Sequence, residues 1–393
     1  MNYTKKQFNN DQPLIFHIDV NSAFLSWTAV KRLQDDPNSV DLRTIPSAIG
    51  GDITTRHGII TAKSIPAKKY NIITGESVVS ALQKCPNLVL TRSDFSLYKH
   101  FSKLFIETLH KYTDNIQQVS IDEAYCNMTG LYEYYRHLET KETPYPMCLA
   151  YAIKDDIRIN LGFTVNVGIS SNKLLAKMAS DFQKPDKVHT LFPEEIQEKM
   201  WPLPINELHG CGKATAQRLN SIGIHTIKDA ALTDQAILRS QLGEKAGDYI
   251  YYSANGINNS KVNPQKREAK SYSNELTTSS NITVDTYDTD MPPLLDSLAK
   301  SVSNRLKKDE QFASTIGAYV KTNTFKTHSA QTTLSASTND YKIILDTANA
   351  LLNKLLLGEN GLFIMGEQIR LVGISASNLD DGSFRQMSLF DLI

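Results

Sequence analysis

The stretch LIFHIDVNSAFLSW, residues 14–27, is the starting point for the fold. Its first six residues form a short apolar run that ends in a carboxylate, which predicts a buried strand over 14–19. The residues from Ser22 to Leu33 predict a helix directly after this strand. Because a buried carboxylate is costly unless something compensates its charge, Asp19 at the strand end is a candidate functional residue.

A second acidic site lies in IQQVSIDEAYC, residues 116–126, which predicts a strand pair or one long strand. Neighbouring strand residues point to opposite faces, but a bulge or turn can bring Asp122 and Glu123 near one cation. Magnesium takes oxygen ligands, and two such ions about 4 Å apart can activate a hydroxyl and stabilise a leaving pyrophosphate. The alternative is that these are surface carboxylates at strand ends.

The composition is that of a soluble globular protein with two to four domains. The chain has 393 residues, of which 41% are hydrophobic and 21% charged. It contains no apolar run long enough to span a membrane, and its N-terminus is polar, so a cytoplasmic location is expected. The four cysteines lack CxxC spacing, which argues against a zinc site or a disulfide framework.

The charge balance is neutral, with 42 basic and 42 acidic residues. Many nucleic-acid-binding proteins are basic overall, so this balance argues mildly against such a partner. A large protein can still confine its positive charge to one groove.

The chain divides into three parts by pattern. Alternating strands and helices up to about residue 170 predict an α+β sheet with helices on one face. Helical stretches dominate from 171 to 255, and a polar linker without apolar periodicity follows at 255–273. A second α+β unit is predicted, with a helix near 291–308 and strands at 312–322, 329–337 and 368–376.

The segment GISSNKLLAKMASDFQKPD, residues 168–186, predicts a strand that turns into a helix capped by Ser171 or Asn172. Lys173, Lys177 and Lys184 lie near the helix start and in the loop after it, where they can hold a triphosphate. The alternative is a solvated helix face with an ordinary N-cap.

Two further motifs point to macromolecular partners. LHGCGKATAQRL, residues 208–219, places a Gly-x-Gly turn between short helices, where backbone N–H groups can grip a DNA phosphate. The alternative is a helix pair with glycine C-caps. QMSLFDL, residues 386–392, can form a one-turn plug with apolar anchors for a partner, or it can pack on its own domain.

Taken in this order, the motifs resemble those of Y-family DNA polymerases, the translesion class. SIDEA at 120–124 matches the metal motif of that family, and 168–186 resembles its palm-to-thumb segment. GIITAKSIPAKKYNI at 58–72 resembles its fingers segment. The resemblance is specific over about 14–230 and weak over 265–380.

The resemblance implies an α+β multidomain fold in the form of a right-hand polymerase. The implied parts are the palm at 1–45 and 93–180, the fingers at 46–92, a helical thumb with helix–hairpin–helix at 181–256, a linker at 257–272, an α+β little finger at 273–378, and a flexible tail with a clamp-binding-like peptide at 379–393.

The resemblance also implies a role for individual residues. Asp19, Asp122 and Glu123, with the Val20 carbonyl, would bind two Mg²⁺ ions, and Phe24 would be the steric gate that excludes ribonucleotides. The nucleotide-binding residues would be Ser22, Ala23, Phe24, Ala62, Lys68 and Lys184. The DNA-binding residues would be Gly210, Gly212, Lys213, Lys266, Arg267 and Lys270. The residues that bind a sliding clamp would be Gln386, Leu389 and Phe390.

The chain departs from the family pattern at several positions. Asn21 stands where many members have Asp, and Ala62, Ile65 and Lys68 stand where many have Thr, Tyr and Arg. These departures favour the branch of the polymerase V catalytic subunit and its ImpB, MucB and SamB-like relatives. Lys in place of Arg loses bidentate phosphate geometry, which weakens the expected grip on the nucleotide.

The predicted activity is low-fidelity, template-directed translesion synthesis on primer-template DNA with deoxynucleoside triphosphates. No separate exonuclease motif is present, so proofreading is not expected. Two other functions remain open, a palm-type nucleotidyl cyclase and a silent DNA-binding scaffold. The need for an accessory subunit is also left open.

Overall fold

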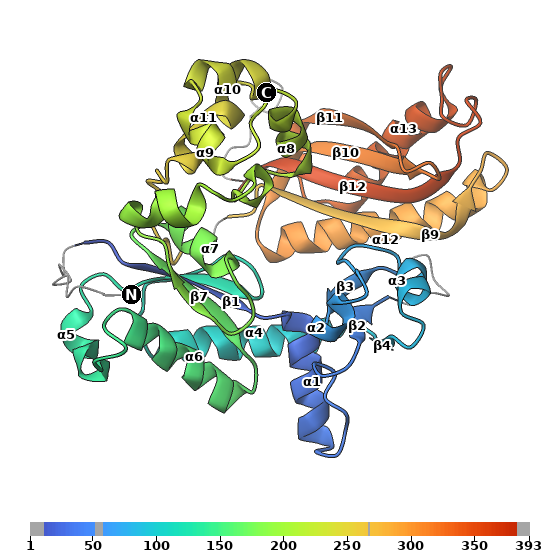
Figure 1. The fold of residues 1–393 in the computed structure, drawn as a ribbon. Coiled ribbons are helices and arrows are strands. Elements are labelled where there is room, and N and C mark those ends of the chain that lie inside the picture. The colour runs from blue at the N-terminus through green and yellow to red at the C-terminus, as the bar shows by residue number, and fades with distance from the viewer. Residues whose placement is uncertain (1–11, 52–57, 266–267, 383–393) are drawn as a thin grey trace. The chain divides into compact units, whose positions relative to one another are not determined.

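The computed structural model describes residues 12–51, 58–265 and 268–382, and Figure 1 shows their fold. The chain divides into two compact units. Of the described residues, the first contains 12–51 and 59–265, and the second contains 268–382.

A five-stranded sheet forms the centre of the first unit, in the order β5-β6-β1-β7-β8. The predicted strand at 14–19 is β1, which lies in the middle and pairs antiparallel with both neighbours. Its side chains are buried on both faces, which explains an apolar run without alternation. The predicted strand pair at 116–126 is confirmed as β5 and β6. The strands are β1 (Ile15–Val20), β5 (Ile116–Gln118), β6 (Glu123–Asn127), β7 (Val165–Ser170) and β8 (Val188–Thr190).

Helices cover both faces of this sheet (Figure 1). On one face α1, α4 and α6 enclose an aromatic core in which Trp27 contacts the rings of Phe101 and Phe163. On the other face α7 packs against β1 and β7. The prediction of helices on one face only is therefore wrong. These helices are α1 (Ala23–Asp35), α4 (Phe95–Leu109), α6 (Met147–Leu161) and α7 (Lys173–Asp181).

Gly168 in β7 is the residue that lets α7 approach the sheet. A Cβ atom at this position would lie 2.0 Å from the Ala176 carbonyl oxygen and 2.4 Å from the Ser180 nitrogen. Both are backbone atoms of α7, which move only if the whole helix moves. Glycine at 168 therefore sets the distance between the helix and the strand.

A smaller sheet with the order β3-β2-β4 follows α1 in the chain. The short helix α2 begins where Ser64 accepts a hydrogen bond from the Ala67 nitrogen, and Pro66 occupies its first turn. The Ser64 hydroxyl also accepts a hydrogen bond from the Ser47 nitrogen at 3.1 Å and donates one to the Ile45 carbonyl oxygen at 2.7 Å, which ties the end of β3 to the start of β2. The elements are β2 (Ser47–Gly50), β3 (Ile60–Lys63), α2 (Ile65–Lys68), α3 (Val78–Lys84) and β4 (Val89–Thr91).

The rest of the first unit is mainly helical, as predicted for 171–255. A separate core of leucine, isoleucine and alanine side chains joins α7 to the helices that follow it. The α-helices are α5 (Tyr132–Tyr135), α8 (Lys213–Asn220), α9 (Ile227–Leu232), α10 (Gln235–Leu242) and α11 (Glu244–Ala254); single 3₁₀ or π turns cover Arg136–Leu138, Pro193–Glu195, Ile196–Met200 and Ile205–Glu207.

The second unit is an antiparallel sheet of order β11-β10-β12-β9, with α12 and α13 packed on it through one core. The predicted helix and three strands are all present, and the structure adds β9 and α13. Strand β9 was missed because its sequence, SYSNELTTSSNI, is polar, as befits an edge strand with many exposed side chains. The elements are β9 (Ser271–Ile282), α12 (Tyr287–Lys308), β10 (Phe312–Thr322), β11 (Thr327–Thr338), α13 (Tyr341–Leu357) and β12 (Ile369–Asp380).

The limits of this unit differ from the predicted little finger at 273–378. Strand β9 begins at Ser271 and β12 ends at Asp380, so regular structure extends two residues beyond the expected limit at each end. The strands pair along nearly their whole length, from Ser271 opposite Ser377 to Phe312 opposite Asp380.

The first half of the predicted linker at 257–272 packs on the central sheet. Val262 packs with Tyr125 of β6 in a small apolar cluster, and the Asn263 nitrogen donates a hydrogen bond to the Gln117 side-chain oxygen at 3.1 Å. A polar sequence without periodicity can therefore still be ordered by isolated contacts.

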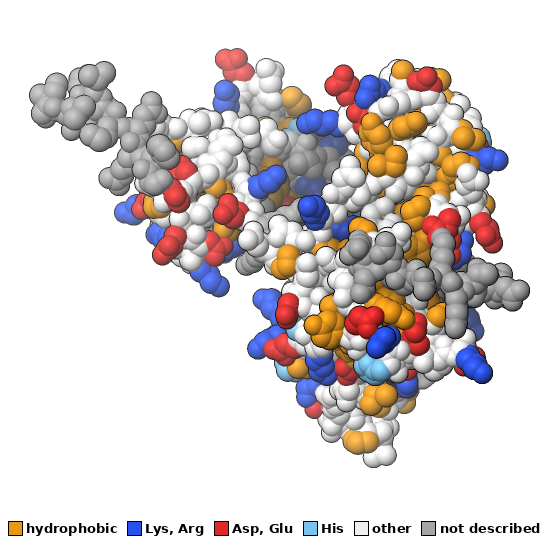
Figure 2. Space-filling view, turned by 90° about the vertical axis from the view of Figure 1, so that its left-hand side faces the viewer, with side chains coloured by type: hydrophobic (Ala, Val, Ile, Leu, Met, Phe, Trp, Pro, Cys, Tyr) orange, Lys and Arg blue, Asp and Glu red, His pale blue; other side chains and the backbone are white. Residues whose placement is uncertain are grey.

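The surface carries charges of both signs. On the face shown in Figure 2, basic and acidic side chains are interspersed, in keeping with their equal numbers. Among the described residues, no helix combines the length and the apolar character that crossing a membrane requires.

We predict that Gly168→Ala destabilises the first unit by about 3 kcal/mol, because the added methyl group must push α7 away from β7. Urea unfolding followed by circular dichroism measures the change. The matched control is Gly212→Ala, whose Cβ would meet nothing within 4 Å and which should cost less than about 1 kcal/mol. Equal unfolding midpoints for the two variants would contradict this account.

Candidate active site

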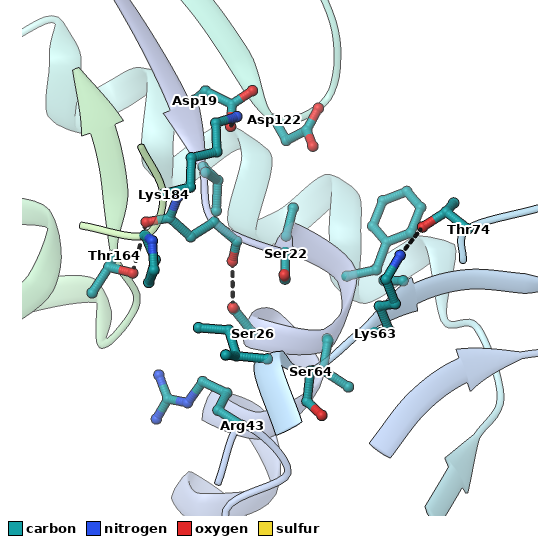
Figure 3. Close-up of a pocket in the computed structure, with 18 of the residues that line it drawn as sticks. Asp19, Ser22, Ser26, Arg43, Lys63, Ser64, Thr74, Asp122, Thr164 and Lys184 are labelled. Atoms are coloured by element: carbon teal, nitrogen blue, oxygen red, sulfur yellow. Dashed lines mark hydrogen bonds and ion pairs between the residues drawn. The ribbon is translucent and has the colours of Figure 1, made fainter. Parts of the chain in front are cut away.

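A cleft of about 480 Å³ opens at the end of β1, between the central sheet and the smaller sheet (Figure 3). Its walls come from the start of α1, from β3 and α2, and from the loop after α7. The predicted site residues that line it are Asp19, Val20, Ser22, Ala23, Phe24, Ala62, Lys68, Asp122 and Lys184.

One strand pair positions all three predicted carboxylates. Asp19 pairs with Glu123 across β1 and β6, and the Val20 nitrogen donates to the Asp122 carbonyl oxygen at 2.9 Å. Asp122 lies in the turn before β6, where its Oδ1 accepts a hydrogen bond from the Ser120 hydroxyl at 2.6 Å. This turn frees the Asp122 and Glu123 side chains from strict strand alternation, as the sequence analysis required.

Two lysines of the α7 region neutralise two of these carboxylates. Lys184 Nζ lies 2.6 Å from Asp19 Oδ1, a contact visible in Figure 3. Lys177 Nζ lies 3.0 Å from Glu123 Oε2 and 3.8 Å from Asp19 Oδ2. Asp181, which was not among the predicted residues, contacts both lysines at 3.4 and 3.0 Å. The result is an ion-pair network that links α7 to the sheet.

The adjacent carboxylates have opposite pKa shifts. Burial raises the pKa of Asp122, and the negative charges of Asp19 and Glu123 raise it further against the Ser120 hydrogen bond. The pKa of Glu123 falls to about 2, first because of the nearby imidazole of His17 and then because of Lys177. Of these two neighbours, Asp122 is therefore the one whose negative charge is less compensated by the residues around it.

The donor set fits a divalent cation. Carboxylates and a backbone carbonyl are the oxygen ligands that hard cations prefer. Burial first, and then the charges of Asp19 and Glu123, raise the pKa of Asp122, and a bound cation would offset both effects. Within the described ranges, no three acidic, histidine or cysteine side chains converge on one point. Asp19 and Glu123 instead contact Lys177 and Lys184.

Phe24, the predicted steric gate, lies on α1 at the cleft wall. Its ring stacks on Tyr98 with centroids 4.3 Å apart and planes 9° from parallel, and it meets Phe95 edge to face. Tyr98 is fully buried, so the stack holds the Phe24 ring in a fixed orientation. The sequence did not point to Tyr98, because it lies 74 residues after Phe24 in the chain. The two rings meet only because α1 packs on α4.

Asn21 binds the loop that carries Lys184. Its Oδ1 accepts hydrogen bonds from the Thr164 hydroxyl at 3.0 Å and from the Asp186 nitrogen at 2.9 Å. Its Nδ2 donates to Asn166 Oδ1 at 3.1 Å. The departure from Asp at this position thus has a structural consequence, because only an amide can accept and donate in this way.

Asn166 continues this network and is fully buried in β7. Its Nδ2 donates to the carbonyl oxygens of Ser180 at 3.0 Å and Gln183 at 2.7 Å, so its Oδ1 must face Asn21. The two amides together tie the end of α7 and the loop at 183–186 to the central sheet.

Two basic residues of the cleft were missed by the sequence analysis. Lys63 Nζ lies 3.3 Å from the Thr74 hydroxyl, and burial together with the charge of Lys68 lowers the pKa of Lys63 (Figure 3). Arg43 also lines the cleft and donates to the Gly162 carbonyl oxygen at 2.7 Å. With Lys184, these side chains make the cleft suited to an anionic ligand.

The Gly-x-Gly motif lines a second cleft of about 620 Å³ together with Asp181 and Lys184. Gly210 has a φ of +84°, and a Cβ there would lie 2.5 Å from the Tyr249 ring, so a side chain at this position would be strained and would have to displace Tyr249. Gly212 caps the start of α8, and Lys213 is the exposed first residue of that helix. The turn predicted from the motif is present.

The remaining predicted residues are in the second unit or outside the described residues. Lys270 is exposed, one residue before β9. Lys266, Arg267, Gln386, Leu389 and Phe390 lie outside the described residues.

Comparison with known proteins places this geometry in a family. The model of the impB/mucB/samB family matches residues 18–181, that of the IMS family HHH motif matches 193–224, and that of the impB/mucB/samB C-terminal domain matches 269–389. DNA polymerase IV of Clostridium acetobutylicum is 40% identical over 96% of this chain and 90% of the relative. DNA polymerase IV 1 of Bacillus subtilis strain 168 is 33% identical over 96% of this chain and 85% of the relative.

The chain belongs to the impB/mucB/samB family, the Y family of DNA polymerases.

The fold comparison agrees with this assignment. The solved structure named "Y-family DNA polymerase chimera Dbh-Dpo4(243-245)-Dbh" is similar with a TM-score of 0.75 and 23% identity, over 93% of this chain and 98% of that one. The predicted fold class, a right-hand polymerase with palm, fingers, thumb and little finger, is confirmed. The limits between these parts remain predictions.

Membership of the Y family implies dependence on a divalent metal, which agrees with the donor set. It also favours a polymerase over the cyclase and scaffold alternatives. The relatives named above are DNA polymerases IV, which weighs against the polymerase V branch that the departures at Asn21 and Lys68 favoured.

We predict that Asn21→Asp destabilises the fold by about 2 kcal/mol, because a carboxylate oxygen would then face the side-chain Oδ1 of Asn166 in a buried position. Urea unfolding near neutral pH measures the loss. Asn349→Asp on the exposed side of α13 introduces the same charge and should change stability by less than about 0.5 kcal/mol. A wild-type unfolding midpoint for Asn21→Asp would show that the amide network carries no stability.

The pKa of Glu123 predicts a pH dependence of stability in the metal-free protein. Because its folded-state pKa of about 2 lies below the ordinary 4.5, the ionised carboxylate stabilises the fold above pH 4.5. This contribution is lost as pH falls from 4.5 toward 2. Between about pH 5 and about pH 3, the urea midpoint of Glu123→Gln should therefore fall less than that of the wild type.

The matched control for this pH series is Glu359→Gln, at an exposed position after α13. Its unfolding midpoint should follow the wild-type curve. A Glu123→Gln curve parallel to that of the wild type would show that the ion pair with Lys177 and the contact with His17 add no stability to the metal-free fold.

Proposed function

We propose that the chain is a DNA-directed DNA polymerase that adds deoxynucleotides to a primer 3′-hydroxyl, at low fidelity and without proofreading, in translesion synthesis. The observation that carries this proposal is the strand pair that brings Asp19 and Asp122 to one end of a cleft rimmed by basic side chains, with Glu123 directly opposite Asp19 on the neighbouring strand. Family membership over nearly the whole chain supports it.

The cofactor proposed is Mg²⁺, with two ions held by Asp19, Asp122, Glu123 and the Val20 carbonyl. When bound, the metal activates the primer hydroxyl and neutralises charge on the leaving pyrophosphate. The other contributions to catalysis come from positioning and charge compensation by the protein itself.

The basic residues of the cleft are proposed to bind the triphosphate. Lys184 can exchange its contact with Asp19 for a phosphate oxygen, and Lys68 faces the same cleft with Lys63. A lysine binds phosphate as a point charge, so two lysines on one wall can offset the absence of an arginine fork.

The cleft wall is proposed to select deoxyribonucleotides and to tolerate distorted templates. The Phe24 ring, held by its stack on Tyr98, would exclude a 2′-hydroxyl group. Ser22, Ala23 and Ala62 are small, which leaves space around the nascent base pair. An open pocket of this kind discriminates poorly between correct and incorrect pairs.

The DNA contacts are proposed at two places. Gly210, Gly212 and Lys213 would bind the DNA backbone through the turn before α8, where the close packing on Tyr249 fixes the backbone. Lys266, Arg267 and Lys270 would add positive charge beside the little finger. The tail QMSLFDL is proposed to bind a sliding clamp through Gln386, Leu389 and Phe390.

The test is primer extension by the purified chain with Mg²⁺ and four deoxynucleoside triphosphates, on an intact template and on one with an abasic site. Asp122→Asn should lower the rate constant about a thousandfold, because metal-ion charge stabilisation is worth several kcal/mol and about 1.4 kcal/mol is tenfold in rate. Asp114→Asn, in the exposed turn before β5, is the matched control and should retain wild-type extension.

If Asp122→Asn extends primers at the wild-type rate, Asp122 has no catalytic role. No extension by the wild type, even with a sliding clamp added, would contradict the proposed function. Failure on the abasic template alone would limit the proposal to synthesis on intact DNA.

A further inference from the structure

His17 is a fully buried polar residue that was not among the predicted site residues. It lies on β1 two residues before Asp19 and points to the face covered by α7, whereas Phe16 and Ile18 point into the aromatic core on the other face. A histidine in the apolar run LIFHID is a residue whose polar atoms need partners.

Both ring nitrogens of His17 face polar groups. Nδ1 lies 2.8 Å from the Ser180 hydroxyl oxygen, and Nε2 lies 3.4 Å from Glu123 Oε2. Among the described residues, Nε2 has no partner at hydrogen-bonding geometry, and the Glu123 carboxylate is the polar group that it faces. The Tyr125 ring packs edge-on at 4.7 Å between centroids and keeps the imidazole between these two groups.

The position of one proton decides what His17 does. The Ser180 hydroxyl lies 2.8 Å from both His17 Nδ1 and the Lys177 carbonyl oxygen, and it has a single proton to donate. If that proton goes to the carbonyl, Nδ1 must carry the imidazole proton and the bare Nε2 faces the carboxylate. If it goes to Nδ1, then Nε2–H points at Glu123.

The second arrangement is the favourable one. Two acceptors that face each other in a buried position cost free energy, whereas a donor facing a carboxylate forms a charge-assisted hydrogen bond. Both arrangements keep the imidazole neutral, as its full burial favours, because a charged ring away from water is costly.

We propose that His17 is a positioning residue that holds the Glu123 carboxylate through its Nε2–H group, with its tautomer set by the Ser180 hydroxyl. The inference rests on the proposed function, in which Glu123 is a metal ligand. Groups that orient ligand carboxylates and histidines typically change metal affinity 10-fold to 100-fold when removed.

The fold connects this contact to the packing of α7. Ser180 reaches His17 only because α7 lies directly against Gly168, and Gly168 pairs with His17 across β1 and β7. The same helix carries Lys177, which contacts the same Glu123 oxygen at 3.0 Å. The carboxylate is thus held between β1 and α7 by a neutral donor and a cation.

The first test is the tautomer of His17, read from ¹⁵N–¹H NMR of the metal-free chain without DNA. The signals are assigned by their loss in His17→Gln. We expect a protonated Nε2 and an unprotonated Nδ1. A protonated Nδ1 with a bare Nε2 would overturn the inference, and this readout does not depend on polymerase activity.

The second test compares two variants by Mn²⁺ titration, with free ion followed by electron paramagnetic resonance. His17→Phe keeps an aromatic ring but has no donor, and we expect its dissociation constant for Mn²⁺ to rise about 10-fold. His17→Gln keeps an amide donor in reach of Glu123 and should stay close to the wild type. In primer extension, His17→Phe should raise the Mg²⁺ requirement without changing KM for the deoxynucleotide.

Thermal unfolding of the variants separates positioning from stability. Equal metal affinity for His17→Phe and the wild type would overturn the inference, and so would equal weakening of both variants at equal Tm. If His17→Phe does not fold, Ser180→Ala replaces it and should weaken Mn²⁺ binding in the same direction. Failure of the wild type to extend primers would instead contradict the proposed function, while the tautomer still decides this inference.

Discussion

The burial of negative charge at the end of β1 is the constraint on which the rest of this structure depends. A strand buried on both faces ends in Asp19, opposite Glu123 and beside Asp122. Carboxylates in such a place need compensation, which Lys177 and Lys184 supply. Helix α7 therefore has to lie against the sheet, since it carries one of these lysines and leads into the other.

The close packing of α7 is achieved by residues that have no chemical role themselves. Gly168 removes the side chain that would separate the helix from β7, and the buried amide of Asn166 binds the carbonyl oxygens at the end of the helix. Asn21 then holds the following loop through Asp186. The position of Lys184 in the cleft thus follows from backbone contacts that begin in the strands.

The parts that could be predicted from the sequence are those with local signals. The two strands that carry the carboxylates could be predicted from the apolar run ending in Asp19 and from the SIDEA motif. The structure pairs these strands with each other. A turn or bulge near Asp122 was also predicted, because the side chains of adjacent strand residues point to opposite faces of a sheet. Phe24, Lys68 and Lys184 came from the family resemblance, and all three line the cleft.

The parts that could not be predicted depend on contacts between distant segments. Asn21 meets Asn166 across 145 residues, and His17 meets Ser180 across 163, so no spacing rule connects them. Strand β9 was hidden by its polar composition, because an edge strand obtains its stability from pairing with β12 more than from burial. In each case the long-range partner, absent from any local pattern, decides the structure.

The contacts of Lys184 couple the binding of the cation to the binding of the triphosphate in the proposed reaction. In the metal-free protein Lys184 compensates the charge of Asp19, a role that a divalent cation held by Asp19 would take over. Lys184 would then be released toward the anionic ligand of the cleft. Binding of cation and triphosphate would therefore favour each other, and by linkage each would strengthen the affinity for the other by the same factor. Lys184 would therefore contact Asp19 in the empty cleft and a phosphate group only when the cation and the triphosphate are both bound.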